Sequence, residues 1–515
     1  MSGAGHRLLQ DSIVRSARTH PDSTALGAQG ARCTYEELLD RSLRFARGLQ
    51  ELGLRRGDRV AIVMPNSIPC VVSLFGTLLA GGVFVVVNAD TKSDRLATIL
   101  EHSQTSFVIG EGSLRDVLSS AVLQAPCVRD VLLSRAAADR GSALDLDDLI
   151  ARSDPHPVDP GSTPFDLAAL IYTSGTTGEP KGVMMTHQNL VYLAGSISEY
   201  LRLSRDDRIF SVLSLAHTYG LSQLIVSTRL GAALHLERSF VYLAQATKVI
   251  EAEAITVFPG VPTVFAMLLS IHRKSPLQLP SVQRVTCAGG ALLPSFLDGL
   301  REIFPNALVF PMYGLTECMR VCFLEPELVM ERPASVGRAI PGSEVMILSP
   351  EGTPVPPGES GILHVRGPHV MPGYWNDPVL TSEMLLEGPV PGARILRTGD
   401  HFRADDEGFL YFIGRSDEII KTRGEKVSPV EIENVVHGIP GVREAAALGV
   451  PDELFGEAIR VYVAVEEGVA LTERDIIAEC RSRLEAFKIP KEVVFLDELP
   501  KTTTGKVRKA SLTAG

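Results

Sequence analysis

The sequence predicts an α/β fold followed by two smaller units of different texture. Short β-branched runs alternate with helical patterns through roughly the first three hundred residues, which is typical of mostly parallel sheets covered by helices on both faces. After about Ala334 the segments shorten and Gly and Pro become frequent, indicating antiparallel hairpins or a small barrel. After about Gly414 the pattern is that of an α+β unit.

The β-branched runs give the expected strands of the α/β part. They are Arg59–Met64, Val83–Val87, Leu170–Thr173, Ile209–Leu213, Ile255–Phe258, Arg284–Ala288 and Leu308–Pro311. Helices are expected between them, for example at Tyr35–Leu52 and Ser93–His102. The first of these has a clear start, because Thr34 followed three residues later by Glu37 matches a capping box.

The stretch Cys70–Val87 is apolar and just long enough to span a membrane. It is interrupted at Gly81–Gly82 and changes from a helical pattern to the β-branched run Val83–Val87. This change predicts a buried helix followed by a buried strand, and no membrane span.

The α+β unit at the end has strands expected at Glu444–Val450, Ile459–Val465 and Glu492–Leu496 and a helix around Thr472–Ala486. A length of 515 residues agrees with more than one packed unit.

The composition limits the function classes. The net charge is −11, which argues against a protein that coats nucleic acid, because phosphate binding needs a cationic face. The seven cysteines are scattered and do not suggest a disulfide framework. The N-terminus lacks a signal-peptide pattern and the C-terminus an address signal, so the expected location is cytoplasmic.

The strongest local signal is the segment YTSGTTGEPKG, Tyr172–Gly182. It follows an expected strand and precedes a helical pattern that begins at Thr186. Hydroxyls, glycines and the positive charge of Lys181 suit a loop that wraps a polyphosphate. The loop is not of the Walker A type, because Lys181 lies between Pro180 and Gly182.

Five segments in order resemble the motifs of the adenylate-forming enzymes, which include acyl- and aryl-CoA synthetases, nonribosomal peptide synthetase adenylation domains and luciferase-like enzymes. They are YTSGTTGEPKG at Tyr172–Gly182, YGLTE at Tyr313–Glu317, LRTGD at Leu396–Asp400, GRSDEIIKTRGEKVSPVEIE at Gly414–Glu433 and PKTTTGKVRK at Pro500–Lys509. Weaker matches lie at Thr34–Leu38, Leu79–Asn88 and Gly361–Trp375.

The resemblance implies a division of the chain. Residues 1–413 would form a large ATP- and acid-binding domain with two parallel-type α/β subdomains and a small barrel-like part at about 334–413. Residues 414–417 would be a hinge, with Asp417 at the turning point. Residues 418–515 would form a small, mobile α+β lid.

The resemblance also implies the nucleotide site. Tyr313 would stack on adenine, Asp400 would accept from both ribose hydroxyls with help from Arg415, and Thr316 would bind the α-phosphate. Glu317 and Thr177 would hold Mg²⁺. The full set expected around ATP or AMP is Thr173, Ser174, Gly175, Thr176, Thr177, Gly178, Gly289, Gly290, Ala291, Tyr313, Gly314, Asp400 and Arg415.

The implied reaction is attack of a carboxylate on the α-phosphate of MgATP, followed by transfer of the acyl group to a thiol. The expected catalytic residues are Lys181, His217, Thr316, Glu317 and Lys506. Lys506 would face the site during adenylation. After a domain rotation, Arg423 and Gly424 would line the thiol tunnel instead.

The acid pocket is expected to include His217, Val261, Met312 and Arg320. Amino-acid-activating relatives carry Asp where this chain has His217, so an α-amino acid is disfavoured. Arg320 has two interpretations: it binds a second polar or anionic group of the acid, or it points outward and pairs with an acidic neighbour.

Two acceptors stay open: coenzyme A, which is the default for a free-standing chain, and the phosphopantetheine thiol of an acyl or peptidyl carrier protein. The oligomeric state also stays open, as monomer or homodimer. The rival hypothesis is a relative that binds nucleotide without turnover. The presence of all four motif residues, Lys181, Glu317, Asp400 and Lys506, argues against it. A light-emitting oxygenase of the same fold is a remote third.

Overall fold

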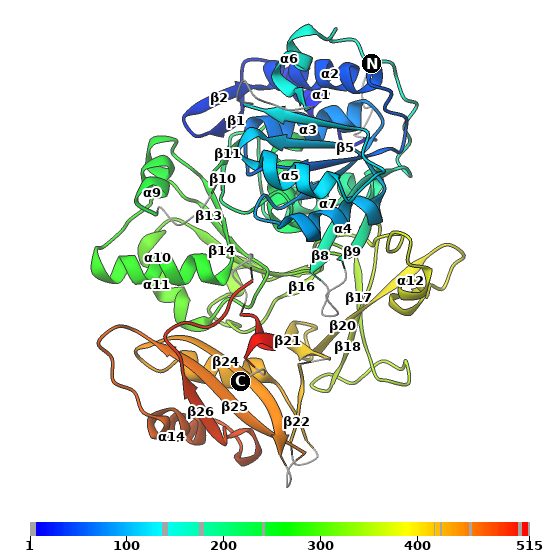
Figure 1. Cartoon of the computed structure of the whole chain (residues 1–515). Helices are drawn as coiled ribbons and strands as arrows, with labels where there is room; N and C mark the ends of the chain where they lie inside the picture. The colour runs from blue at the N-terminus through cyan, green and yellow to red at the C-terminus, as the bar shows by residue number, and fades with distance from the viewer. Residues whose placement is uncertain are drawn as a thin grey trace.

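The computed structural model describes residues 7–135, 143–174, 180–238, 243–416, 418–422, 425–452, 456–502 and 507–512. Within these residues the strands form four sheets. The first two are mostly parallel and carry most of the helices, the third is antiparallel, and the fourth lies in the C-terminal part (Figure 1). The predicted α/β class is confirmed.

The first sheet has the order β7-β6-β5-β3-β4-β8-β9, in which β9 alone of the described strands runs antiparallel to its neighbour. Its strands are β3 Arg59–Val63, β4 Val83–Val87, β5 Thr105–Glu111, β6 Asp130–Ser134, β7 Leu144–Asp145, β8 Leu167–Ser174 and β9 Pro180–Thr186. The accompanying helices are α2 Tyr35–Glu51, α3 Ile68–Leu79, α4 Ser93–Ser103, α5 Arg115–Val122 and α6 Leu146–Arg152.

Local signals explain several boundaries in this region. Thr34 and Glu37 form the predicted capping box at the start of α2, which stabilises a helix N-terminus by satisfying its backbone N–H groups. The apolar stretch divides as expected: α3 ends at Leu79, Gly81 adopts φ +86, and β4 begins at Val83. No helix within the described residues is both long enough and apolar enough to cross a membrane.

The second sheet has the order β16-β15-β14-β13-β12-β10-β11-β1-β2. Its strands are β1 Thr24–Ala28, β2 Ala31–Thr34, β10 Arg208–Ser211, β11 Ala233–Leu236, β12 Val257–Gly260, β13 Arg284–Cys287, β14 Leu308–Tyr313, β15 Cys322–Phe323 and β16 Arg338–Ala339. Its region contains helices α1 Asp11–Thr19, α7 His187–Tyr200, α8 Thr218–Leu230, α9 Leu243–Ala252, α10 Pro262–Lys274 and α11 Leu297–Ile303.

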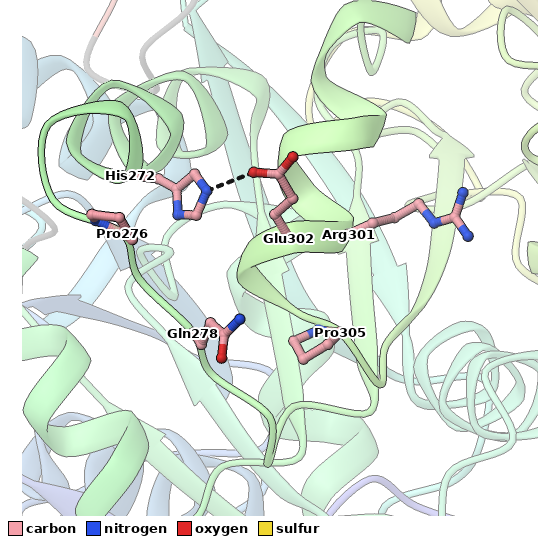
Figure 2. Close-up of a pocket in the computed structure, with 6 residues that line it drawn as sticks. All are labelled: His272, Pro276, Gln278, Arg301, Glu302 and Pro305. Atoms are coloured by element: carbon pink, nitrogen blue, oxygen red, sulfur yellow. Dashed lines mark hydrogen bonds and ion pairs between the residues drawn. The ribbon is translucent and has the colours of Figure 1, made fainter.

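A shallow hollow on the surface lies between α10 and α11 (Figure 2). His272 on α10 pairs with Glu302 on α11 across it, with Nε2 and Oε2 2.9 Å apart. The other lining residues are Pro276, Gln278, Arg301 and Pro305. None of these residues belongs to the site that the sequence predicts.

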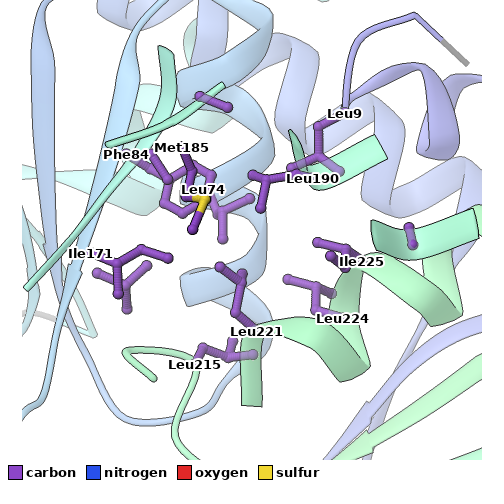
Figure 3. Close-up of a cluster of buried hydrophobic side chains, with 14 of the residues drawn as sticks. Leu9, Leu74, Phe84, Ile171, Met185, Leu190, Leu215, Leu221, Leu224 and Ile225 are labelled. Atoms are coloured by element: carbon purple, nitrogen blue, oxygen red, sulfur yellow. The ribbon is translucent and has the colours of Figure 1, made fainter. Parts of the chain in front are cut away.

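The main core joins the first two sheets. In Figure 3, Leu74 of α3, Phe84 of β4 and Met185 of β9 lie near Leu190 of α7 and Leu224 of α8. All of these side chains are almost completely buried. Burial of this apolar surface holds the two sheets together as one unit.

The third sheet corrects one expectation. Its strands are β17 Glu344–Leu348, β18 Ser360–Arg366, β19 Leu385–Glu387, β20 Arg394–Ala404 and β21 Leu410–Arg415, with helix α12 Pro378–Met384 beside them. The order is β17-β18-β20-β19, and β21 also pairs with β20. Over the described residues β17 does not pair with β19 or β21, so the barrel-like part predicted at about 334–413 is an open antiparallel sheet.

A second correction concerns the segment after the predicted polyphosphate loop. The last three residues of that segment, Pro180–Gly182, begin the strand β9, which continues to Thr186 directly before the helix α7. β8 and β9 pair as a hairpin in which Lys181 lies opposite Thr173. The helix itself begins as expected, with Thr186 and Asn189 forming a capping box.

The C-terminal part has its own sheet and core. The order is β23-β22-β25-β24, with β26 also on β25. The elements are β22 Ile420–Thr422, β23 Glu425–Val427, α13 Pro429–His437, β24 Val442–Asp452, β25 Gly456–Val465, α14 Glu473–Arg483, β26 Glu492–Phe495 and a short 3₁₀ turn, η5 Lys509–Ser511. Ile432, Val461 and Ile476 are buried at the centre of this core, and the predicted α+β texture is confirmed.

Candidate active site

Several predicted site segments follow neighbouring parallel strands of the second sheet. His217 follows β10, Val261 follows β12, Gly289–Ala291 follow β13, and Tyr313 ends β14. The carboxyl ends of parallel strands meet at one edge of a sheet, where ligands of open α/β folds bind. The topology therefore brings the nucleotide and acid segments to one edge.

A tyrosine–aspartate pair stands at this edge. The Tyr313 hydroxyl donates to Asp400 Oδ2 on β20 at 2.5 Å. The Tyr313 ring contacts Phe402 edge-on and lies near-parallel to Phe412, with centroids 4.8 and 6.1 Å away. Burial, and secondly the Asp400 charge, raise the pKa of Tyr313 well above its usual value. The phenol therefore stays a donor, and the ring and the carboxylate have a fixed relation.

A second hydroxyl–carboxylate pair holds Glu317. The Tyr374 hydroxyl donates to Glu317 Oε1 at 2.6 Å, and the Met371 backbone N–H donates to the Glu317 carbonyl oxygen at 2.9 Å. Burial, followed by the Glu317 charge, raises the pKa of Tyr374, whereas the charge of Arg415 acts in the opposite direction. Arg415 therefore acts electrostatically on the pair, and β21 places it opposite Asp400 of β20.

The segment that carries Tyr374 also contacts the β8–β9 hairpin. The Trp375 backbone N–H donates to the Gly182 carbonyl oxygen at 2.7 Å, and the Met184 N–H donates to the Gly373 carbonyl oxygen at 3.1 Å. Residues 371–375 thus join Glu317 to the strand that carries Lys181.

The backbone between Tyr313 and Arg320 turns tightly. Met319 adopts φ +58, an uncommon conformation for a residue with a side chain. A Cβ atom on Gly314 would lie 2.4 Å from the Met319 carbonyl oxygen and 2.9 Å from Arg320 Cα. Glycine at 314 is required by this close approach, which places Arg320 beside the end of β14.

Part of the predicted site lies outside the described residues. This applies to Gly175, Thr176, Thr177, Gly178, Asp417, Arg423, Gly424 and Lys506, and also to the side chain of Ser174. Thr173 and Lys181 border the loop region on paired strands.

The residues predicted for the acid pocket come from several elements. His217 is the N-cap residue of α8, and a Cβ atom on Gly220 would lie 2.2 Å from the Ser214 carbonyl oxygen, so the preceding segment folds directly onto this helix. A Cβ atom on Gly290 would lie 3.1 Å from Pro262 Cγ, which places the Gly289–Gly290 stretch against the start of α10, next to Val261. Met312 is buried on β14.

Arg320 is inside the protein. Its exposed fraction is 2%, and its guanidinium lies 5.0 Å from the centre of the Tyr219 ring on α8. The interpretation in which Arg320 points outward to an acidic partner is wrong.

The residues around Glu317 can be tested for a fit to Mg²⁺. Among the described residues there is no group of three or more His, Cys, Asp or Glu side chains that could hold a metal. One oxygen of Glu317 accepts from Tyr374. A single carboxylate is what Mg²⁺ uses when phosphate oxygens and water complete its shell, so Glu317 fits; Thr177 is outside the described part.

Sequence reasoning missed Tyr374, Tyr200, Tyr219 and the Phe402–Phe412 pair as contributors to the site. One signal for Tyr374 was present, since it lies in the weakly matching segment Gly361–Trp375. Phe402 is two residues from Asp400 on the same strand, so its side chain shares a face with that carboxylate.

The fold and the site together define an adenylate-forming enzyme. The model of the AMP-binding enzyme family matches residues 13–375, and that of the AMP-binding enzyme C-terminal domain matches residues 431–506. A feruloyl-CoA synthase from Amycolatopsis sp is 33% identical over 513 residues, with 97% of each chain covered. A long-chain-fatty-acid–CoA ligase from Escherichia coli is 32% identical, covering 98% of this chain and 94% of that protein.

Solved structures agree over the whole chain. An anthranilate CoA ligase in complex with anthranoyl-AMP matches with a TM-score of 0.91 and 26% identity, covering 98% of this chain and 96% of that one. The o-succinylbenzoate CoA synthetase of Bacillus subtilis, with ATP and magnesium ion, matches with a TM-score of 0.85 and 28% identity, covering 97% and 98%.

The chain belongs to the AMP-binding enzyme family. It is an AMP-forming acid–thiol ligase of the acyl-CoA synthetase type.

Proposed function

We propose that the protein uses MgATP to activate a small carboxylic acid as an acyl-adenylate and then passes the acyl group to the thiol of coenzyme A. The observation that carries this proposal is the pair of partly buried hydroxyl–carboxylate contacts, Tyr313–Asp400 and Tyr374–Glu317. They support the roles that the proposal gives to the Tyr313 ring at adenine, to Asp400 at the ribose and to Glu317 at the metal.

Each group of the nucleotide has a matching residue. The face of Tyr313 stacks on adenine. The Asp400 carboxylate accepts from the ribose hydroxyls, as an ionised carboxylate with several lone pairs can. Since both groups are fixed before ATP arrives, little ordering has to accompany binding.

In the first step a carboxylate oxygen of the acid attacks the α-phosphorus, the bond to the β-phosphate oxygen breaks, and pyrophosphate leaves. Both reactants are anions, so catalysis needs positive charge and positioning. Lys181 and Lys506 supply charge, and Thr316 donates to the α-phosphate. When bound at Glu317 and Thr177, Mg²⁺ neutralises phosphate charge.

In the second step the thiol sulfur attacks the acyl carbon, and the bond to the phosphate oxygen breaks so that AMP leaves. His217 lies between the acid pocket and the thiol path. We assign residues 1–413 to the large domain, 414–417 to a hinge at Asp417, and 418–515 to a lid that exchanges Lys506 for Arg423 and Gly424 between the two steps.

Coenzyme A is the acceptor that the relatives favour, because their names describe CoA ligases. The phosphopantetheine arm of a carrier protein carries the same terminal thiol and is the alternative. The relatives act on acids as different as ferulate and long-chain fatty acids, so they leave the acid open. A cytoplasmic location stays a prediction from the sequence.

Acid-dependent exchange of pyrophosphate into ATP tests the first step, and trapping of the product with CoA or with a carrier protein tests the second. We expect exchange with a subset of a diverse acid panel and thioester formation with free CoA. Absence of exchange with every acid would contradict adenylation, and thioester formation with a carrier protein alone would select the alternative acceptor.

A further inference from the structure

Arg320 is a buried cation without a counter-ion among the described residues. Its side chain is 2% exposed, and its Nε is shielded from solvent without a hydrogen-bond partner. None of the ion pairs in the described part of the chain includes it. Arg, like other charged residues, is almost never fully buried unless it is paired.

The groups around the guanidinium are polar or polarisable but uncharged. The Tyr219 ring lies beneath it, and it hydrogen-bonds the Tyr200 hydroxyl. That hydroxyl donates in turn to Met312 Sδ at 3.2 Å, and the Tyr219 hydroxyl donates to the Thr286 carbonyl oxygen at 2.9 Å.

The neighbouring acidic groups do not supply the missing negative charge. Burial raises the pKa of Tyr200 to about 12. Burial also raises the pKa of Tyr219 and of the Cys287 thiol, although the Arg320 charge opposes this rise. Near neutral pH these groups are therefore protonated and carry no charge.

The position of Arg320 connects it to the acid-binding region. It follows Glu317 by three residues, and its Cα approaches Gly314 closely. Its stacking partner Tyr219 is two residues from His217 at the start of α8. Through Tyr200 it reaches Met312 of β14. The guanidinium therefore lies among the elements assigned to the acid pocket.

We propose that Arg320 binds a second carboxylate of the substrate, so that the enzyme activates one end of a dicarboxylic acid while Arg320 holds the other. An arginine fork matches a carboxylate with two parallel hydrogen bonds. The ligand then supplies the negative charge that the described protein groups lack. This inference rests on the proposed function, because it names the substrate class of the same site.

Matched pairs of acids test the proposal in the unmodified protein. Adipate is compared with hexanoate, and 4-carboxycinnamate with cinnamate, by the kcat/KM of pyrophosphate release. Because loss of one partner of a buried charge pair is costly, we expect the dicarboxylate of at least one pair to be preferred by about 100-fold. Equal or better use of the monocarboxylate in both pairs would overturn the proposal.

Substitutions of Arg320 test whether its side chain causes the preference for dicarboxylic acids. Arg320→Met should lose about 100-fold on the dicarboxylate and gain on the monocarboxylate, and Arg320→Lys should retain a partial preference because the charge stays but the fork is lost. The control is Arg129→Met. The Arg129 guanidinium also lies over an aromatic ring, 4.9 Å from the centre of the Phe107 ring, but in the first sheet. It should leave the preference unchanged.

The outcomes separate this inference from the proposed function. An Arg320→Met protein that keeps the wild-type acid preference, or that changes only the KM for ATP, overturns the role of Arg320 while adenylation stands. If the wild-type protein shows no pyrophosphate exchange with any of the acids, adenylation itself is contradicted. If Arg320→Met does not fold, the matched pairs in the wild type still decide.

Discussion

The nucleotide half of the site and the segment next to Lys506 are held by different forces. Tyr313 and Asp400 are joined by a partly buried hydrogen bond, and the Tyr313 ring packs against the rings of Phe402 and Phe412. The C-terminal turn η5 combines apolar packing of Leu512 with ion pairs: Lys509 Nζ lies 2.8 Å from Glu433 Oε1 and 3.6 Å from Glu418 Oε2. Lys501 pairs in the same way with Glu444 and Glu498.

Because of this difference, the two parts of the molecule are suited to different roles in the proposed reaction. Buried, preformed dipoles stabilise a developing charge without having to reorganise. The Lys509–Glu433 pair is mostly shielded from water, with side chains 19% and 17% exposed, and a shielded ion pair holds its segment in place only while both partners stay together. In the proposed mechanism, nucleotide recognition is assigned to Tyr313 and Asp400 in the large domain, and Lys506 is assigned to the C-terminal part that changes position between the two steps.

The largest expected effect is that of Lys506→Ala on adenylate formation. Removal of a charge aimed at the transition state should lower acid-dependent pyrophosphate exchange by about 1000-fold. The measurement is the exchange rate at saturating ATP and acid. A loss of less than about tenfold would contradict the role assigned to Lys506.

Asp400→Asn should come next, with a loss of about 100-fold in kcat/KM for ATP, because a charged partner of the ribose hydroxyls is replaced by a neutral one. Tyr313→Phe should lose less, since the ring remains. Tyr411→Phe is the matched control, because Tyr411 donates to Asp405 at 3.1 Å in the same sheet. An equal loss in Tyr411→Phe would assign the effect to stability.

The pH dependence of stability should reflect His187. Burial lowers the pKa of His187 to about 4, and its Nδ1 accepts from the Leu9 backbone N–H at 3.2 Å. Above pH 6.5 the imidazole is neutral in both the folded and the unfolded chain. The contribution of His187 to the free energy of unfolding is therefore fully present there. As the pH falls from about 6.5 to 4, only the unfolded chain takes up the proton, and up to about 3 kcal/mol is lost.

Urea unfolding at pH 7 and pH 5 measures this effect. The midpoint should fall at pH 5 in the wild type and fall less in His187→Gln. Exposed His156 gives the control variant His156→Gln, which should behave as the wild type. A wild-type midpoint that rises toward pH 5 would contradict the sign.

The smallest effect is expected for Lys509→Met. Loss of the pairs with Glu433 and Glu418 should loosen the turn that follows Lys506 and lower pyrophosphate exchange by about fivefold, with KM for ATP unchanged. Lys491→Met removes a comparable ion pair with Asp452 at 2.5 Å and is the control. An equal change in both variants would show that Lys509 has no specific positioning role.

Sequence patterns predicted much of the fold because the relevant signals are local. The strand Val83–Val87 and the start of α2 follow from residues within a few positions of one another. The β1–β2 hairpin was missed although it is local and turns at Gln29 and Gly30, whereas the pairing of β1 with β11, about two hundred residues away, has no local signal. Whether the third sheet closes likewise depends on pairing between distant edges, which periodicity does not encode.

In the candidate site, too, some features were predictable from local sequence patterns and others were not. Motif segments predicted which residues meet at the sheet edge, since the parallel topology gathers the ends of consecutive strands. The hydroxyl of Tyr374 on Glu317 joins residues 57 positions apart, and Arg320 is buried directly after Met319, which has a positive φ. Neither follows from a local pattern.

The most direct test is thioester formation from supplied acyl-adenylate and CoA by the Lys506→Ala and Asp400→Asn variants. In the proposed mechanism, Tyr313 and Asp400 serve both steps and Lys506 serves only the first. We therefore expect Lys506→Ala to form the thioester at close to the wild-type rate while Asp400→Asn is impaired. Equal impairment of both steps in Lys506→Ala would contradict the claim that Lys506 acts only in the first step while Tyr313 and Asp400 act in both.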